Sequence, residues 1–155
     1  ENALNSGADK VAINSKALED PDFLSKAVSS FGESTILVNI EAKKISEERW
    51  EPYKFCGREK TNLNLIDWIN TIQNKGCGEI LLTSIDKEGT ETGFDIDLIN
   101  NVHKIIKKPL IVSGGCGNLN HIQEVNKRFK DVSVAVASVL HYKILKISEI
   151  KKFFL

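Results

Sequence analysis

The sequence predicts an α/β fold in which helices cover a largely parallel sheet. Short runs of apolar and β-branched residues alternate with amphipathic segments along the whole chain. These runs are apolar on both faces, which is typical of parallel strands buried between two layers. With 155 residues, 41% of them hydrophobic and 27% charged, the chain has the length of one domain with a sizeable core.

Five segments have the composition of buried strands. They are VAIN (11–14), TILVNIEAK (35–43), EILLTSI (79–85), PLIVSGG (109–115) and VSVAVASVL (132–140). Five amphipathic segments predict the intervening helices. They are DPDFLSKAVSSFG (20–32), LNLIDWINTIQNKG (63–76), FDIDLINNVHKIIK (94–107), NLNHIQEVNKRF (118–129) and ISEIKKFFL (147–155).

Proline and glycine set several of these boundaries. Pro21 stands near the start of the first predicted helix and Gly32 directly after its end. Segment 44–61 contains Pro52 and Gly57 and is predicted to be a loop or a hairpin excursion. Its Trp50 either covers a ligand together with Tyr53 or packs with it on the rim.

The order of elements fits either an open doubly wound sheet or a (β/α)8 TIM barrel. The glycine-rich turn follows the fourth strand rather than the first, and no acidic residue stands about twenty positions later, so a dinucleotide site is not indicated. A barrel is favoured, but eight units need roughly 200 residues or more. We therefore expect residues 1–155 to form a single domain, a partial barrel of about five units that lacks the N-terminal three. The absence of methionine and the opening ENALNSG, which resembles a helix end, agree with a chain cut from a longer one.

Composition excludes several classes of function. Lys plus Arg equals Asp plus Glu, with 21 of each, so net charge predicts neither a nucleic-acid nor a membrane partner. No apolar run has the length of a transmembrane helix. Three scattered cysteines without ligand spacing predict free thiols, no metal site and a cytoplasmic location.

Polar or small residues end every predicted strand. The set is Asn14, Ser15, Glu41, Lys43, Thr83, Asp86, Ser113, Gly114, Gly115, Ala137 and Ser138. Because barrel active sites lie at the carboxyl ends of the strands, this distribution predicts a site there. VAINS (11–15) and VAVAS (134–138) also share a pattern, in which apolar residues alternate with other residues and a serine comes last. Strands about four units apart lie on opposite sides of a barrel mouth, so these two segments would face each other. Two such anion cradles would hold a long substrate by phosphates at both ends.

These motifs resemble the cyclase subunit of imidazole glycerol phosphate synthase, a barrel of histidine biosynthesis. The resemblance rests on GADKVAINS, GCGEILLTSIDKEGTETGFD, PLIVSGGCG and ASVLHYKILKISEIKKFF, which come in family order. It implies a lyase that needs no cofactor and receives ammonia from a glutaminase partner. The ammonia is added to an open-chain bisphosphate aminoimidazole ribonucleotide, and ring closure and cleavage give imidazole glycerol phosphate and an aminoimidazole carboxamide ribotide.

The resemblance also implies roles for individual residues. Asn14 and Ser15 would bind one phosphate, and the other would lie against the five positions Gly89, Gly114, Gly115, Ala137 and Ser138. Lys43, Thr83, Asp86 and Ser113 would lie near the substrate. Lys10 and Glu79 would belong to the ammonia entrance. Their positions in the sequence alone, without the resemblance, predict only exposed charged residues on the rim of the barrel.

Glu41 would be one of two acid–base groups, but the family usually has aspartate there. The second catalytic aspartate of the family lies on the first strand, which is absent here, so we expect the 155 residues alone to be inactive. Two other hypotheses stay open. One is a cyclase-like protein of amidino-sugar synthesis, and the other is a barrel fragment that binds phosphate without catalysis.

Overall fold

The computed structural model describes residues 1–152 and contains one seven-stranded sheet. The strands are β1 (Val11–Ile13), β2 (Ile36–Ser46), β3 (Arg49–Lys54), β4 (Glu59–Lys60), β5 (Glu79–Ser84), β6 (Leu110–Ser113) and β7 (Val132–Ala135). Strands β1, β2, β5, β6 and β7 run parallel, whereas β2, β3 and β4 are joined in antiparallel pairs. The five parallel strands confirm the predicted α/β architecture of a partial barrel.

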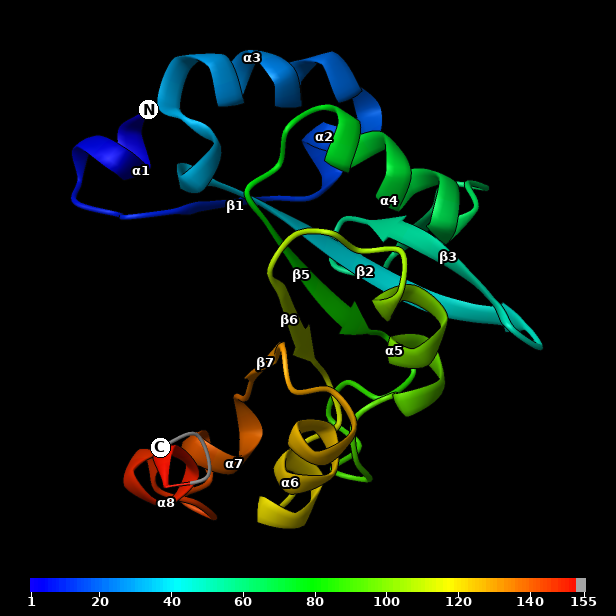
Figure 1. Ribbon diagram of the computed structural model, residues 1–155, viewed down its shortest axis with the longest axis vertical. Coiled ribbons are helices and arrows are strands. Elements are labelled where there is room, and N and C mark those ends of the chain that lie inside the picture. The colour runs from blue at the N-terminus through cyan, green and yellow to red at the C-terminus, as the bar shows by residue number, and fades with distance from the viewer. Residues whose placement is uncertain (153–155) are drawn as a thin grey trace.

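The helices are short and alternate with the parallel strands (Figure 1). They are α1 (Asn2–Asn5), α2 (Ser15–Glu19), α3 (Pro21–Phe31), α4 (Leu65–Asn74), α5 (Ile96–His103), α6 (Leu119–Arg128), α7 (Ser138–His141) and α8 (Ile147–Lys151), with a 3₁₀ turn η1 (Glu33–Thr35) before β2. Within residues 1–152, no helix is long and apolar enough to span a membrane.

The core lies between one face of the sheet and helices α3 to α6. Val38, Ile40, Ile80, Leu82 and Val112 point into it and are almost fully buried. Apolar residues at helical spacing complete it, namely Leu24, Trp68, Ile69, Ile72, Leu98, Ile99, Val102, Ile122 and Val125. Since side chains alternate along a strand, the residues between the buried ones project from the other, concave face.

Strand β2 shares one of its edges between two partners. Its first residues pair with β1, where Ile13 lies opposite Val38. Farther along the same strand, Glu41 lies opposite Tyr53 of β3. The hairpin predicted for segment 44–61 therefore continues the sheet beyond the end of β1, and Trp50 packs into the core with only 3% of its surface exposed.

Several boundaries differ from the prediction. Helix α5 ends at His103 and not at residue 107, and β6 ends at Ser113, before the two glycines. Segment 132–140 is not one strand, because β7 stops at Ala135 and the chain turns at Ala137 into α7. Strand β2 extends beyond residue 43 to Ser46, since its pairing with β3 prolongs it. The terminal helix is Ile147–Lys151 and is followed by its C-cap Lys152, and the last predicted positions, 153–155, lie outside the described residues.

We expect Gly78→Ala to destabilise the fold. The Gly78 N–H donates to the Ile36 carbonyl, and an added Cβ would stand 2.1 Å from the carbonyl oxygen of Glu33. That oxygen belongs to the backbone of η1, so β5 and η1 would have to separate, at a cost of about 1–3 kcal/mol. Urea denaturation followed by circular dichroism measures the loss, and an unchanged midpoint would contradict this close approach.

Candidate active site

The strand register places four residues in one row on the concave face. Glu41 pairs with Thr83, Thr83 with Ser113, and Ser113 with Ala135. Each stands at or near the carboxyl end of the parallel part of its strand, and their buried neighbours point to the opposite face. The predicted strand-end residues Glu41, Thr83 and Ser113 therefore lie side by side, with Ala135 of β7 next in the row. The predicted Ala137 and Ser138 follow β7, at the turn into α7.

Two adjoining pockets open along this row. One is lined by Glu41, Cys56, Gly57, Thr83, Ile85, Glu88 and Ser113. The second is lined by Glu88, Gly89, Glu91, Ser113, Gly114, Gly115, Cys116, Ala135, Val136, Ala137 and Ser138. Because both include Glu88 and Ser113, the pocket at Glu41 and the pocket at the glycine-rich loop are neighbours. Sequence reasoning placed Glu88 after the third strand but assigned it no role, although its position directly before Gly89 in DKEGT could have indicated one.

Glu41 is held by two N–H donors. Its Oε2 atom lies 2.9 Å from Nδ2 of Asn14 and 2.9 Å from the backbone nitrogen of Gly57. Among residues 1–152, no hydrogen bond reaches Oε1. One carboxylate oxygen is thus fixed by the protein, and the other is left for a ligand.

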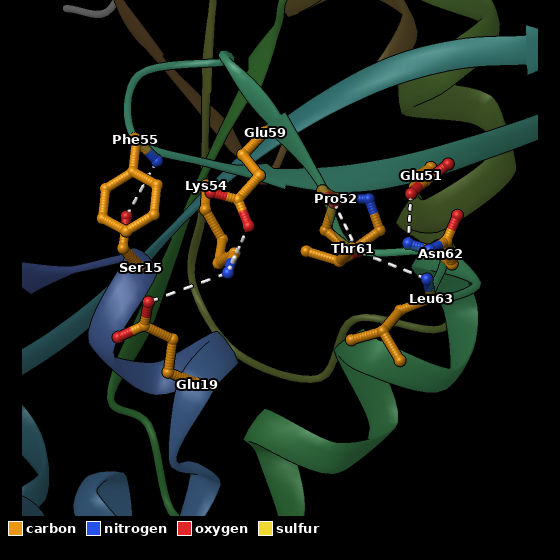
Figure 2. A network of polar contacts seen from close by, with 10 residues as sticks. All are labelled: Ser15, Glu19, Glu51, Pro52, Lys54, Phe55, Glu59, Thr61, Asn62 and Leu63. Atoms are coloured by element: carbon orange, nitrogen blue, oxygen red, sulfur yellow. Dashed lines mark hydrogen bonds and ion pairs between the residues drawn. The ribbon is translucent and has the colours of Figure 1, made fainter.

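The hairpin that supplies Gly57 is anchored on α2 (Figure 2). The Phe55 N–H donates to Oγ of Ser15 at 2.9 Å, and Lys54 contacts carboxylates of Glu59 at 2.9 Å and Glu19 at 3.7 Å. At its other end, Thr61 donates to the Pro52 carbonyl and Glu51 accepts from the Asn62 N–H. These contacts hold the turn over the end of β1.

The glycines of SGG are required by contacts within the chain. Gly114 and Gly115 have φ values of 98° and 92°, which favour glycine. A Cβ on Gly115 would lie 2.1 Å from the Gly93 carbonyl oxygen, and one on Gly114 would lie 2.8 Å from that of Ser84. The loop between β5 and α5 therefore packs directly on the glycine turn. This packing is sufficient to explain why glycines are required at these two positions, without a bound anion.

The same pocket still offers backbone donors. Among the described residues, no hydrogen bond takes up the N–H groups of Gly89 and Ser138. The Gly114 N–H is directed at the Ala135 carbonyl in the parallel ladder between β6 and β7. Gly89 has a φ of 73°, and nothing lies within 4 Å of its added Cβ position, so its backbone is open to the pocket. Such free N–H groups are suited to binding an oxyanion.

The internal repeat noted in the sequence is also a structural repeat. Asn14 and Ala137 have similar unusual conformations, with φ and ψ of −121° and −88° for the first and −124° and −67° for the second. The carbonyl of each accepts from the residues three and four positions ahead, and each is followed by a serine that begins a short helix. The two turns differ in one respect, since only Ser15 contacts the hairpin.

The remaining predicted residues lie farther from the two pockets. Asp86 is exposed and accepts from the Lys44 N–H at 2.7 Å, so it ties the β5–α5 loop to β2. Lys43 is exposed, and its ammonium stands 5.7 Å from the ring centre of Tyr53. Lys10 and Glu79 form an ion pair at the amino ends of β1 and β5, opposite the carboxyl row.

Two histidines, His121 and His141, follow the glycine turn and the last strand, and neither is placed as a catalytic group. Nδ1 of His121 accepts from the Gly117 N–H at 3.0 Å and so holds the loop after the glycine turn. His141 is exposed and contacts Tyr142 edge to face. The described part of the chain contains no cluster of three or more metal-ligating side chains.

Comparison with known proteins agrees with this geometry. Residues 1–146 match the family model described as histidine biosynthesis protein. The chain belongs to that family. It is 39% identical over 149 residues to imidazole glycerol phosphate synthase subunit HisF of Streptococcus mutans, covering 96% of this chain and 59% of the relative. The same subunit of Bacillus cereus is 40% identical over 97% of this chain and 60% of the relative.

The family resemblance inferred from the sequence is thereby confirmed. A third relative, the HisF subunit of Lactococcus lactis subsp. cremoris, is 41% identical over 96% of this chain and 58% of its own length. The chain thus spans about three fifths of the length of these relatives.

Cysteine chemistry at the site is predicted to be confined to Cys56. Burial raises the pKa of the Cys77 and Cys116 thiols to about 11, so at pH 8 only about one in a thousand of either is a thiolate. Cys56 lies exposed on the hairpin turn. We expect iodoacetamide at pH 8 to alkylate only Cys56 in the folded protein, and mass spectrometry counts the modified residues. Equally rapid labelling of Cys116 would contradict its burial beside the glycine loop.

Proposed function

We propose that this chain forms the acid–base and phosphate-binding part of the cyclase subunit of an imidazole glycerol phosphate synthase. The observation that carries the proposal is the position of Glu41, whose pocket adjoins the pocket lined by the glycine loop and Ser138 and shares Glu88 and Ser113 with it. The names of the relatives support the same activity. The substrate is the open-chain bisphosphate ribonucleotide implied by the resemblance.

In this proposal the two serine turns bind the two phosphates. At the β6–β7 side, the N–H groups of Gly89 and Ser138 receive one phosphate, with Gly114, Gly115 and Ala137 shaping the pocket. At the β1 side, the backbone at Ser15 receives the other. The Ser15 oxygen already accepts from Phe55, so its own proton remains available for donation to an anion.

The chemistry between the phosphates falls to carboxylates and hydroxyl groups. Glu41 exchanges protons with the substrate as it adds ammonia and closes the ring. Thr83 and Ser113, its neighbours in the row, provide hydroxyl groups near the reacting carbons. No Lys or Arg lines the pocket at the glycine loop, whereas Glu88 and Glu91 do. Binding there therefore relies on backbone N–H groups, and the carboxylates suit the hydroxyl groups of the sugar chain.

Ammonia would come from a glutaminase subunit docked at the amino ends of the strands. The relatives are named as subunits of a synthase, which supports a second component. The Lys10–Glu79 ion pair lies at that end and would border the entrance. The protein would act in the cytoplasm as a single barrel domain, to which residues 1–155 contribute the parallel strands described above.

One observation favours a second function. Glu41 has one more methylene group than the aspartate that is usual in the cyclase family. Its longer side chain reaches the hairpin turn at Gly57. A cyclase-like enzyme that delivers ammonia to a sugar, forming an amidine, would use the same barrel with a shifted acid–base group. Assaying the complete protein with ammonium salt and either acceptor separates the two functions. Phosphate binding without turnover of either acceptor would instead favour a non-catalytic role.

We expect Glu41→Gln to lower ammonium-dependent turnover of the complete protein by about 10²- to 10⁴-fold, because it removes a positioned acid–base group. Glutamine retains the shape and can still accept a hydrogen bond, so the fold is kept. Steady-state kinetics with saturating ammonium measures the effect, and Glu59→Gln on the outer hairpin strand is the matched control. Retention of full turnover by the Glu41 variant would refute the proposed function.

Reversing the charge of Lys10 is expected to separate the two sources of ammonia. Lys10→Glu places two carboxylates together at the amino end of β1, so glutamine-dependent turnover should fall several-fold more than turnover with added ammonium. The double variant Lys10→Glu with Glu79→Lys restores the ion pair and should recover part of the loss. If both assays fall by the same factor in the single variant, Lys10 has only a structural role.

A further inference from the structure

We propose that Asn14 is a positioning residue for the Glu41 carboxylate and not a phosphate ligand through its side chain. Together with the hairpin turn Phe55–Gly57 it determines which carboxylate oxygen faces the substrate. This inference rests on the proposed function, since it concerns the acid–base group of that reaction. It reverses the role that the resemblance implied for the Asn14 amide.

The hydrogen bonds of Asn14 leave its side chain with nothing to offer an anion. Its Nδ2 atom has two protons, and the structure gives it two acceptors, Oε2 of Glu41 at 2.9 Å and the Tyr53 carbonyl at 3.2 Å. The other end of the amide, Oδ1, is buried and has no partner among the described residues. An oxygen of this kind can only accept hydrogen bonds and would repel a phosphate.

The second donor to Glu41 belongs to a conformationally restricted turn. Phe55, Cys56 and Gly57 have φ values of 53°, 58° and 75°, all in the left-handed region. Non-glycine residues adopt this conformation only when their surroundings hold them there. The Phe55 N–H bond to Ser15 and the packing of Gly57 on Ile85 provide that support. The Gly57 N–H is therefore directed at Glu41 before any ligand binds.

Both donors act on the same atom, Oε2. A glutamate side chain has three rotatable bonds, and it would sample several orientations in a half-open pocket without these contacts. With Oε2 fixed, Oε1 is left as the oxygen that exchanges a proton. Misplacement of a reacting group by about 1 Å can cost on the order of a hundredfold in rate, so loss of the Asn14 contact should reduce turnover although the substrate still binds.

A double-mutant cycle on the complete protein tests this role. Asn14→Ala should lower kcat with ammonium by about 10- to 100-fold and leave KM unchanged. In a Glu41→Gln background the same change should cost nothing further, because no carboxylate remains to be positioned. Inorganic phosphate, titrated by calorimetry, should bind the Asn14→Ala variant as tightly as the parent. Asn120→Ala, at an exposed asparagine on α6, is the matched control and should change neither quantity.

An isosteric variant covers the case in which Asn14→Ala fails to fold. Asn14→Asp keeps the shape, removes both N–H donors and places a second carboxylate beside Glu41. A like charge favours the protonated form of its neighbour, so the acidic limb of the pH–rate profile should move to higher pH. A residue that only supports the fold would not shift that limb.

Three outcomes would overturn the inference. They are an equal loss of kcat in both Glu41 backgrounds, a loss of phosphate affinity in either Asn14 variant, and an unmoved pH profile in Asn14→Asp. If Glu41→Gln is itself fully active, the proposed function falls and this inference falls with it. If Glu41→Gln is inactive and the Asn14 effect is merely additive, only the inference falls.

Discussion

The divided edge of β2 is the constraint on which the rest of the site depends. Strand β1 occupies the edge as far as Val38, and the hairpin strand β3 occupies it from Glu41 onward. Because β1 stops there, Asn14 comes to lie beside the hairpin instead of continuing the ladder. The end of one strand, the turn of the hairpin and the carboxylate of β2 thus meet at a single point. A longer β1 would displace the hairpin and leave Glu41 without its two N–H donors.

A second constraint acts on the other side of the mouth, where two loops interlock. The glycine turn after β6 accommodates the carbonyl oxygens of Ser84 and Gly93 at distances that no side chain would allow. The Gly93 N–H also donates to the Gly115 carbonyl at 2.7 Å, so a hydrogen bond holds the two loops together in addition to their close packing. This packing keeps the glycine turn and the Gly89 loop together without a ligand. The donors for an anion are consequently arranged before binding, which reduces the ordering that binding requires.

Much of this architecture could be predicted because its signals are local. Apolar strands, helix boundaries at Pro21 and Gly32, and polar strand ends all depend on neighbouring residues. All five parallel strands and the boundaries of α3 were found where expected, although β7 is shorter and β2 longer than predicted. The repeated pattern of VAINS and VAVAS proved to be a repeated backbone geometry as well. Spacing alone also indicated that Glu41, Thr83 and Ser113 would share an edge, since parallel strands align their ends.

The contacts that decide individual roles could not be predicted, because they join distant segments. The donation from Gly57 to Glu41 depends on the left-handed turn at Phe55 and Cys56, for which the sequence carries only a glycine as a signal. The burial of Trp50 depends on the register of β3 against β2. The contact of Gly115 with Gly93 likewise requires the packing of two loops, which no local pattern reveals.

The central claim is that two similar turns hold anionic groups on either side of Glu41. A crystal structure of the complete protein grown or soaked with inorganic phosphate tests it most directly. The account predicts one phosphate beside Gly114, against the N–H groups of Gly89 and Ser138, and a second at the backbone of Ser15. Phosphate bound only elsewhere, or absent from both turns at saturating concentration, would contradict it.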